Sequence, residues 1–183
     1  MTGREREYIR IFHEVALAIT SLDSLKEVLA RVVREMAKAL GAMGASVRLL
    51  DPQRGELVLL ASYGLKQEYL EKGQVVASKS IADTLKGQTV WIEDAVADPR
   101  VAFPEDNRRE GIRSILSVPM ALDGRVTGAL RLYFSEPRRL DANDIRFAEA
   151  LATQAAIGVG NARIFENLKR EYQEVVRGVA SIA

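Results

Sequence analysis

The feature that most restricts the fold is a C-terminal stretch of about 40 residues that contains no helix breaker apart from isolated glycines. Asp141 has an N-capping side chain and Asp144 stands three residues later, so we expect a long helix to begin there. Such a helix cannot bury its far end on a chain of 183 residues. Its second half repeats apolar residues at alternating spacings of three and four, which is typical of a coiled-coil seam: Phe165, Leu168, Tyr172, Val175, Val179 and Ile182.

A second apolar stripe near the N-terminus predicts a helix over residues 5–20, and its members are Ile9, Phe12, Ala16 and Ile19. Another amphipathic helix follows and ends at the C-cap residue Gly41; its apolar face is Leu25, Val28, Leu29, Val32, Met36 and Leu40. We expect the N-terminal stripe and the C-terminal seam to pair across a two-fold axis in a parallel homodimer with a central helical bundle. The alternative is a tail that lacks order or docks back on its own domain.

The middle of the chain carries two hairpin patterns. The runs GASVRLLD and ELVLLASYGL flank the turn DPQRG, and IRSILSVPMAL and VTGALRLYF flank Asp123-Gly124, a pair typical of a two-residue turn. Between them lie a short helix in SIADTLKGQ, a strand in TVWIEDA and the irregular segment DPRVAFPEDNRREG. This order of elements predicts an α+β sandwich with a central antiparallel sheet and flanking N- and C-terminal helices.

Composition excludes several classes of site. The chain has no cysteine, which excludes disulfides, thiolate nucleophiles and thiolate metal sites, and its one histidine, His13, excludes His-pair metal sites. A net charge of +1 favours neither nucleic acid nor a membrane surface as a partner, and no apolar stretch approaches the roughly 20 residues of a membrane span. No acid/base or metal motif is recognisable among the carboxylates, so we expect no enzyme activity and no bound metal. With no signal peptide, we expect a cytoplasmic protein.

From about Leu25 to Phe165 the chain resembles the GAF domain family, on four segments in register: the first hairpin, SIADTLKGQTVWIEDAVADPR, EGIRSILSVPMALDGRVTGALRLYF and the LDANDIRFAEALATQAAIGVGNARIFE helix. The resemblance implies a sheet of about five antiparallel strands, covered on one face by the second and last helices. The resemblance also implies that the connecting segment roofs the other face and forms a small-molecule pocket. With the two helical stripes added, we expect an N-terminal dimerisation and signalling helix over 1–22, the GAF domain over 23–165 and a coiled-coil extension over 166–183.

The ligand and any cofactor stay open. Family members bind cyclic nucleotides, tetrapyrroles, haem, 2-oxo acids or metals, and some bind nothing. Pigment-binding members and the methionine-sulfoxide reductase members need cysteine, which this chain lacks, and the spaced Asn-Lys-Phe-Asp-Glu signature of phosphodiesterase GAF domains is missing. A covalent bilin is therefore excluded. His13 lies outside the expected pocket, which favours a solvated or interface residue over a haem ligand.

The alternation of side chains along the strands indicates candidate residues for the ligand-binding site. Ser46, Arg48 and Leu50 form one face of the first strand, and Thr127, Ala129, Arg131 and Tyr133 form one face of the last. If the family's strand order holds, Arg48 and Arg131 share the roofed face and suit a carboxylate or phosphate. The alternative is that they pair with the roof carboxylates Asp94, Glu105 or Asp106. Further candidates for the pocket are the aromatic residues Tyr63, Trp91 and Phe103, which are otherwise core residues, and Arg113 and Ser114 at its mouth.

The resulting prediction is a non-catalytic sensory GAF domain of a bacterial signalling protein. A ligand or partner shifts the last strand and the long helix, and the dimeric helices pass the signal to a missing effector: a kinase, cyclase, phosphatase or transcriptional activator. Because the seam is interrupted at Ala183, we expect a piece of a larger regulator. The alternative is a structural dimerisation module with an empty pocket.

Overall fold

The computed structural model describes residues 2–20, 24–51, 53–71, 81–138 and 140–180, with side chains described as far as residue 173. Within these ranges the helices are α1 (Gly3–Thr20), α2 (Leu25–Leu40), α3 (Gln67–Leu70), α4 (Ala82–Leu85), α5 (Pro104–Glu110) and α6 (Ala142–Ala180). The strands are β1 (Gly44–Asp51), β2 (Glu56–Tyr63), β3 (Val90–Ile92), β4 (Ser114–Leu122) and β5 (Arg125–Phe134). No helix in this part of the chain is both long and apolar enough to cross a membrane.

The strands form one five-stranded sheet in the order β2-β1-β5-β4-β3, with every neighbouring pair antiparallel. The predicted α+β sandwich with a central antiparallel sheet is therefore confirmed. The β4–β5 turn has positive φ at both central residues, 50° at Asp123 and 74° at Gly124, as a two-residue turn that follows the strand twist requires.

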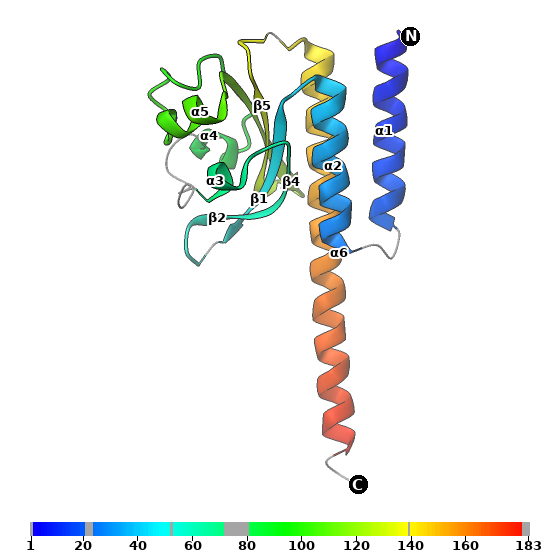
Figure 1. Ribbon diagram of the computed structural model, residues 1–183. Helices are drawn as coiled ribbons and strands as arrows, with labels where there is room; N and C mark the ends of the chain where they lie inside the picture. Colours follow the sequence, from blue (N-terminus) through cyan, green and yellow to red (C-terminus); the bar gives the residue numbers. More distant parts are fainter. Residues whose placement is uncertain (1, 21–23, 52, 72–80, 139, 181–183) are drawn as a thin grey trace.

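Figure 1 shows the layers. α2 and α6 cover one face of the sheet, α3, α4 and α5 lie over the other, and α1 packs on the outer side of the α2/α6 layer. The main core lies between the sheet and α2/α6, where fully buried side chains include Leu29 and Met36 from α2, Leu130 and Leu132 from β5, and Leu151 from α6. We call these two sides of the sheet the helix face and the roof face.

Local signals explain the ends of the two covering helices. Ser24 and Glu27 form a reciprocal capping box at the start of α2, and Gly41 ends that helix with a left-handed φ of 63°. At the start of α6 the Asp141 Oδ1 accepts hydrogen bonds from the backbone N–H groups of Asn143 and Asp144, at 2.8 and 2.9 Å. α6 therefore begins where the sequence predicts.

α1 is docked on its own domain. It packs on α2 and α6 through a stripe about one position earlier than the predicted one: Tyr8, Ile11, Val15 and Ala18. Pairing of the predicted stripe with a second copy stays a prediction. Phe12 and Ile19 lie at the edge of that contact, Ala16 is half-buried, and Ile9 points outward with 59% of its surface exposed. Because α1 carries apolar residues on two overlapping stripes, only docking against α2 and α6 decides which stripe is buried.

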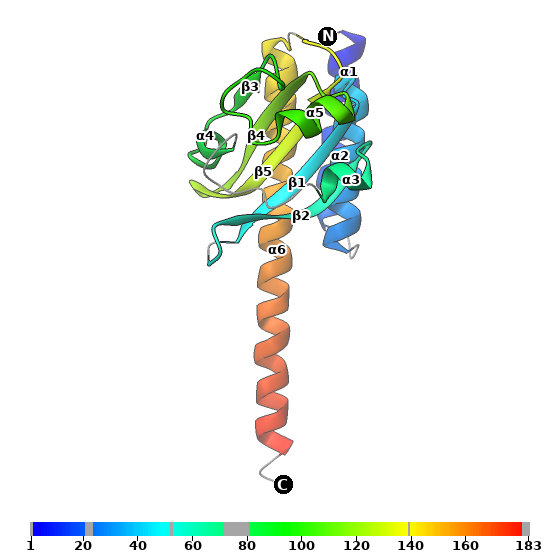
Figure 2. The same ribbon diagram turned by 60° about the vertical axis from the view of Figure 1, so that its left-hand side comes forward.

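The tail of α6 extends well past the sheet, as Figures 1 and 2 show. Ala148 to Val159 contribute to the core, whereas the large apolar side chains beyond them are about 60–70% exposed, namely Ile164, Phe165, Leu168 and Tyr172. Of the remaining predicted seam positions, Val175 and Val179 lie in the helix but their side chains fall outside the description, and Ile182 lies outside the described residues.

Candidate ligand-binding site

Two buried arginines lie on neighbouring central strands of the roof face. In the β1–β5 register Arg131 is opposite Ser46 and Arg48 is opposite Ala129, so the arginines are diagonal neighbours on one face. Each is only 7% exposed. Figure 2 shows this side of the molecule, with α3, α4 and α5 in front of the strands.

Close approach of β1 and β5 depends on Gly128. A Cβ at this position would overlap the carbonyl oxygen of Arg48 and crowd Leu49. Glycine therefore lets β5 lie against the β1 segment that carries Arg48.

The two guanidinium groups differ in their partners. Arg48 Nη1 donates to the carbonyl of Leu57 at 3.2 Å, and burial lowers the pKa of Arg48, with the charge of Arg131 acting in the same direction. The Arg131 Cζ lies 5.9 Å from the ring centroid of Tyr133. Its Nε and Nη2 are buried and have no hydrogen-bond partner within the described residues. Buried donors without a partner are rare in folded proteins, so the presence of two on Arg131 calls for a physical explanation.

Hydroxyl groups flank Arg131 on both sides. In the register Arg131 pairs with Ser46 of β1 and Ser117 of β4. Ser46 Oγ lies 3.0 Å from the Tyr133 hydroxyl, and Thr84 of α4 donates to Ser117 Oγ at 2.9 Å. Sequence reasoning did not select these groups, although Ser46 and Tyr133 stand in the same alternating sets as the two arginines.

A buried polar chain ties the roof to the sheet. The Tyr69 hydroxyl of α3 donates to Asn107 Oδ1 of α5 at 2.8 Å, and Asn107 Nδ2 donates to the carbonyl of Ala95 at 2.8 Å. The rings of Tyr69 and Tyr133 meet edge to face with centroids 5.8 Å apart. Burial raises the pKa of Tyr69, so its hydroxyl stays a donor. No sequence signal marked Tyr69 or Asn107, because both lie on short helices without periodicity.

Two of the three roof carboxylates that we considered as partners are engaged elsewhere. Asp94 Oδ1 accepts from the backbone N–H groups of Val96 and Ala97, and Glu105 pairs with Arg108 at 2.7 Å. Among the described residues, no ion pair joins Arg48 or Arg131 to Asp94, Glu105 or Asp106.

Of the other predicted site residues, Phe103 lies on the same side of the sheet as the arginines, where it packs with Leu57, Ile81 and Ala129. Three others lie on the helix face, because they alternate with the roof set: Tyr63, Trp91 and Ser114. Trp91 meets Phe134 edge to face at 5.7 Å, and Ser114 donates to the carbonyl of Glu136 at 2.7 Å in the β5–α6 connection.

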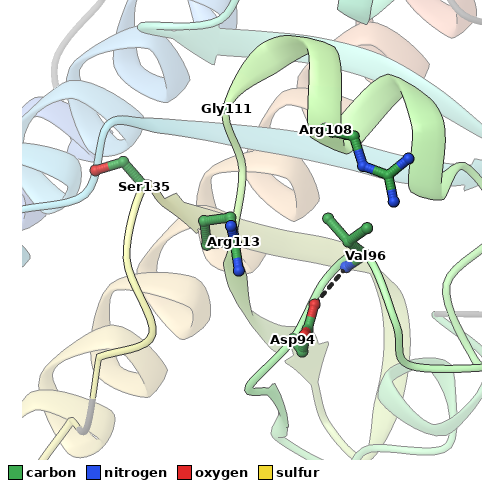
Figure 3. Close-up of a pocket in the computed structure, with 6 residues that line it drawn as sticks. All are labelled: Asp94, Val96, Arg108, Gly111, Arg113 and Ser135. Atoms are coloured by element: carbon green, nitrogen blue, oxygen red, sulfur yellow. Dashed lines mark hydrogen bonds between the residues drawn. The ribbon is translucent and has the colours of Figure 1, made fainter.

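Arg113 is exposed and lines a separate surface hollow with Asp94, Val96, Arg108, Gly111 and Ser135. Figure 3 shows Arg108 entering this hollow from α5 and Arg113 from the segment just before β4. The carboxylate that lines this hollow, Asp94, accepts a hydrogen bond from the backbone N–H of Val96. Arg108 and Arg113 are both exposed to solvent. The hollow is therefore an ordinary polar surface feature, distinct from the buried pair on β1 and β5.

β5 leads from Arg131 and Tyr133 through the connection to α6, and α1 is attached at the same point. The Tyr8 hydroxyl donates to Asp144 Oδ1 at 2.7 Å, and Arg4 contacts both Asp144, at 3.3 Å, and Asp141. The ring of Tyr8 stacks on Phe147 with centroids 3.9 Å apart. The start of α6 is thus joined to the strand that carries the site and to the N-terminal helix.

The fold is that of a small α+β domain with a buried polar cluster on the roof face of its sheet. The GAF domain family model matches residues 23–159, well over half of the chain, and the chain therefore belongs to the GAF domain family. None of the curated proteins compared with the chain matches it.

Solved structures agree on the fold. The GAF domain from a phosphoenolpyruvate-protein phosphotransferase of Coxiella burnetii is 20% identical with a TM-score of 0.77, and the alignment covers 91% of this chain and 99% of that one. A domain of a putative two-component sensor histidine kinase from Sinorhizobium meliloti 1021 is 21% identical (TM-score 0.69, 81% and 98% covered). Free methionine-R-sulfoxide reductase from Neisseria meningitidis, solved with its substrate, is 20% identical (TM-score 0.72, 89% and 94% covered). At these identities the likeness shows the fold alone.

Proposed function

We propose that this chain is a non-catalytic sensory GAF domain, which binds a small ligand on the roof face and relays binding through its terminal helices to an effector. The observation that carries the proposal is the buried guanidinium of Arg131, whose Nε and Nη2 lack a partner within the described residues. Leaving buried donors unpaired costs free energy, about 1–3 kcal/mol for each group. A ligand that pairs with them supplies a reason to keep an arginine at this position.

No reaction is proposed. The reductase neighbour belongs to a branch that we expect to work through cysteine, and this chain has none. Among the described residues no group of His, Asp and Glu side chains is arranged to hold a metal ion. The buried groups at the site are arginines, hydroxyls and an amide, a set that suits binding better than proton transfer.

The relay follows the chain. A ligand on Arg131 touches β5, whose end connects to Asp141 and α6, and that same connection is held by Ser114 and, through Asp144, by Tyr8. Ligand binding shifts the helices to the extent that the ligand prefers one arrangement of this connection over another. In this proposal the domain over 23–165 is cytoplasmic and bacterial. The helices over 1–22 and 166–183 lead to a kinase, cyclase, phosphatase or transcriptional activator.

A second copy of the chain is the proposed partner of the α6 tail. Phe165, Leu168 and Tyr172 are exposed and follow the heptad spacing of a two-stranded coiled coil. On α1, Ile9 and Leu17 are also exposed and add apolar surface on the outer side of that helix. Pairing of two chains buries side chains that a monomer leaves in water.

Ligand binding is tested by thermal unfolding of the purified chain in the presence of nucleotides, oxo acids and other small metabolites. We expect at least one class to raise the Tm, and the Arg48→Ala and Arg131→Ala variants to lose the effect. Arg113→Ala, which removes an exposed arginine outside the site, should keep it. If no compound stabilises the protein, the alternative function, a structural dimerisation module with an empty site, is favoured.

Dimerisation is tested by sedimentation of the full chain and of a chain that ends after Phe165. We expect a dimer for the first and a monomer for the second at equal concentration. An unchanged dimer in the truncated chain would show that the α6 seam is not what holds the two copies together.

A further inference from the structure

The unpartnered atoms of Arg131 form one defined edge of its guanidinium. Nη2 is the terminal nitrogen trans to Cδ, so one of its N–H bonds lies beside the N–H of Nε and points the same way. These are the two nitrogens that have no partner within the described residues. Two parallel N–H donors in one plane match the two oxygens of a carboxylate, the bidentate arrangement for which arginine is used.

The charge around this edge is positive. Arg48 lies diagonally across the β1–β5 register, and the pair is buried where the effective dielectric constant is low. Glu110, a buried carboxylate on α5, accepts from the backbone N–H of Lys66 at 2.8 Å and lies 3.9 Å from Lys66 Nζ. Two adjacent buried cations with no described counter-ion favour a ligand with two negative charges over a ligand with one.

The hydroxyl groups add donors to the site. Ser46 and Tyr133 have two hydroxyl hydrogens between them, of which their mutual hydrogen bond uses one. Thr84 donates to Ser117, which leaves the hydrogen of Ser117 Oγ available. Together with Nε and Nη2 of Arg131, the site therefore offers several unused donors that acceptor oxygens of a ligand would pair with.

Phosphate is the competing anion. Phosphate sites typically use backbone N–H groups at a helix N-terminus or in a nest. Around Arg48 and Arg131 the backbone belongs to the paired ladders of β1, β4 and β5, and the available donors are side chains. This arrangement favours planar carboxylates held by arginine edges.

We propose that the ligand is a small dicarboxylate, with one carboxylate on the Nε–Nη2 edge of Arg131 and the other reaching Arg48. This inference rests on the proposed function, because it names the class of compound that the sensory site takes. Ser117 and one hydroxyl of the Ser46–Tyr133 pair donate to the remaining oxygens. The diagonal placement of the two arginines selects a ligand whose two carboxylates are separated by a short chain.

The test is calorimetric titration of the full chain with succinate and glutarate, compared with acetate, the neutral succinamide, inorganic phosphate and AMP. We expect the dicarboxylates to bind, acetate to bind more weakly and succinamide not to bind. Arg131→Lys keeps the charge but replaces two parallel donors with one ammonium group, and should weaken dicarboxylate binding about tenfold to a hundredfold. Arg113→Lys is the matched control on the exposed surface and should leave the affinity unchanged.

A third variant separates binding from folding. Arg131→Met removes the unpaired guanidinium and should give a chain at least as stable as the parent without ligand, but without dicarboxylate binding. If phosphate or AMP binds and the dicarboxylates do not, the dicarboxylate inference is overturned while the sensory function stands. Dicarboxylate binding that survives Arg131→Lys unchanged also overturns it. If no compound binds, the inference and the proposed function fail together.

Discussion

The contact between α1 and the start of α6 allows a sharp stability prediction. The Tyr8 hydroxyl donates to Asp144 Oδ1 at 2.7 Å, and both side chains are buried. Burial, together with the hydrogen bond to the Asp144 carboxylate, raises the pKa of Tyr8, so the hydroxyl remains a donor at any pH near neutral. Tyr8→Phe removes this donor while the ring that stacks on Phe147 stays.

The magnitude follows from what remains around Asp144. A hydrogen bond to a buried charged group contributes about 1.5–3 kcal/mol. Asp144 keeps the backbone N–H of Asp141 at 3.0 Å and the guanidinium of Arg4 at 3.3 Å, so its charge is not left alone. We therefore expect Tyr8→Phe to lower the free energy of unfolding by about 2 kcal/mol, near the lower end of that range. For a chain of this size that corresponds to a decrease in Tm of about 4–8 °C.

The assay is thermal and urea unfolding followed by circular dichroism, at one protein concentration for all variants. Tyr63→Phe is the matched control, because it removes the same hydroxyl from a half-buried tyrosine outside the α1–α6 contact and outside the proposed dimer seam. The control should stay within about 0.5 kcal/mol of the parent. If Tyr8→Phe is no less stable than Tyr63→Phe, the hydrogen bond to Asp144 does not hold α1 on α6.

Three further predictions concern the sheet, the cap of α6 and its tail. Gly128→Ala should destabilise the chain by about 1–3 kcal/mol in urea unfolding and weaken ligand binding, because the added Cβ overlaps the carbonyl of Arg48; an unchanged midpoint would refute the close approach of β1 and β5. The backbone N–H of Asp144, followed by an arginine of α1, lowers the pKa of Asp141 in the folded chain. The stability that this carboxylate adds is therefore present above about pH 4 and is lost as the pH falls through the lowered pKa. Asp141→Asn should accordingly show a weaker loss of Tm on acidification below pH 4 than the parent, and parallel curves would contradict the assignment. Leu168→Glu should convert the dimer to a monomer in sedimentation, with the Tm of the domain measured as the control; a dimer that persists would exclude Leu168 from the seam.

Much of the fold follows from patterns that are local in the chain. The strand over Gly44–Asp51 begins and ends where the apolar run and the following turn predict, and Asp123-Gly124 forms the expected two-residue turn. Ser24, Gly41 and Asp141 mark helix ends because each supplies a hydrogen bond or a backbone conformation that the neighbouring residues require. Alternation along each strand predicts the face of Arg48 and of Arg131 within its own strand, whereas their placement on one shared face also depended on the strand order of the GAF family, which pairs β1 with β5.

Other parts depend on contacts between elements distant in sequence. Trp91 and Tyr63 are aromatic residues of the kind that often lines a pocket, but the register of β3 and β2 places them on the helix face. α1 buries Tyr8 and exposes Ile9, because its contact with α2 and α6 chooses between two overlapping stripes. The hydrogen bond from Tyr69 to Asn107 joins two short helices that carry no periodic pattern.

The sequence alone determined the main helices and strands and several of their ends, because periodicity and capping act over a few residues. Only the tertiary structure decided which buried groups have partners. In the sequence Arg131 is one of 26 lysine and arginine residues. It becomes buried, with two donor atoms that have no partner among the described residues, only when β1, β4 and the roof pack around it. Burial and hydrogen bonding are properties of the whole packed arrangement, and they are what turn this arginine into a candidate binding group.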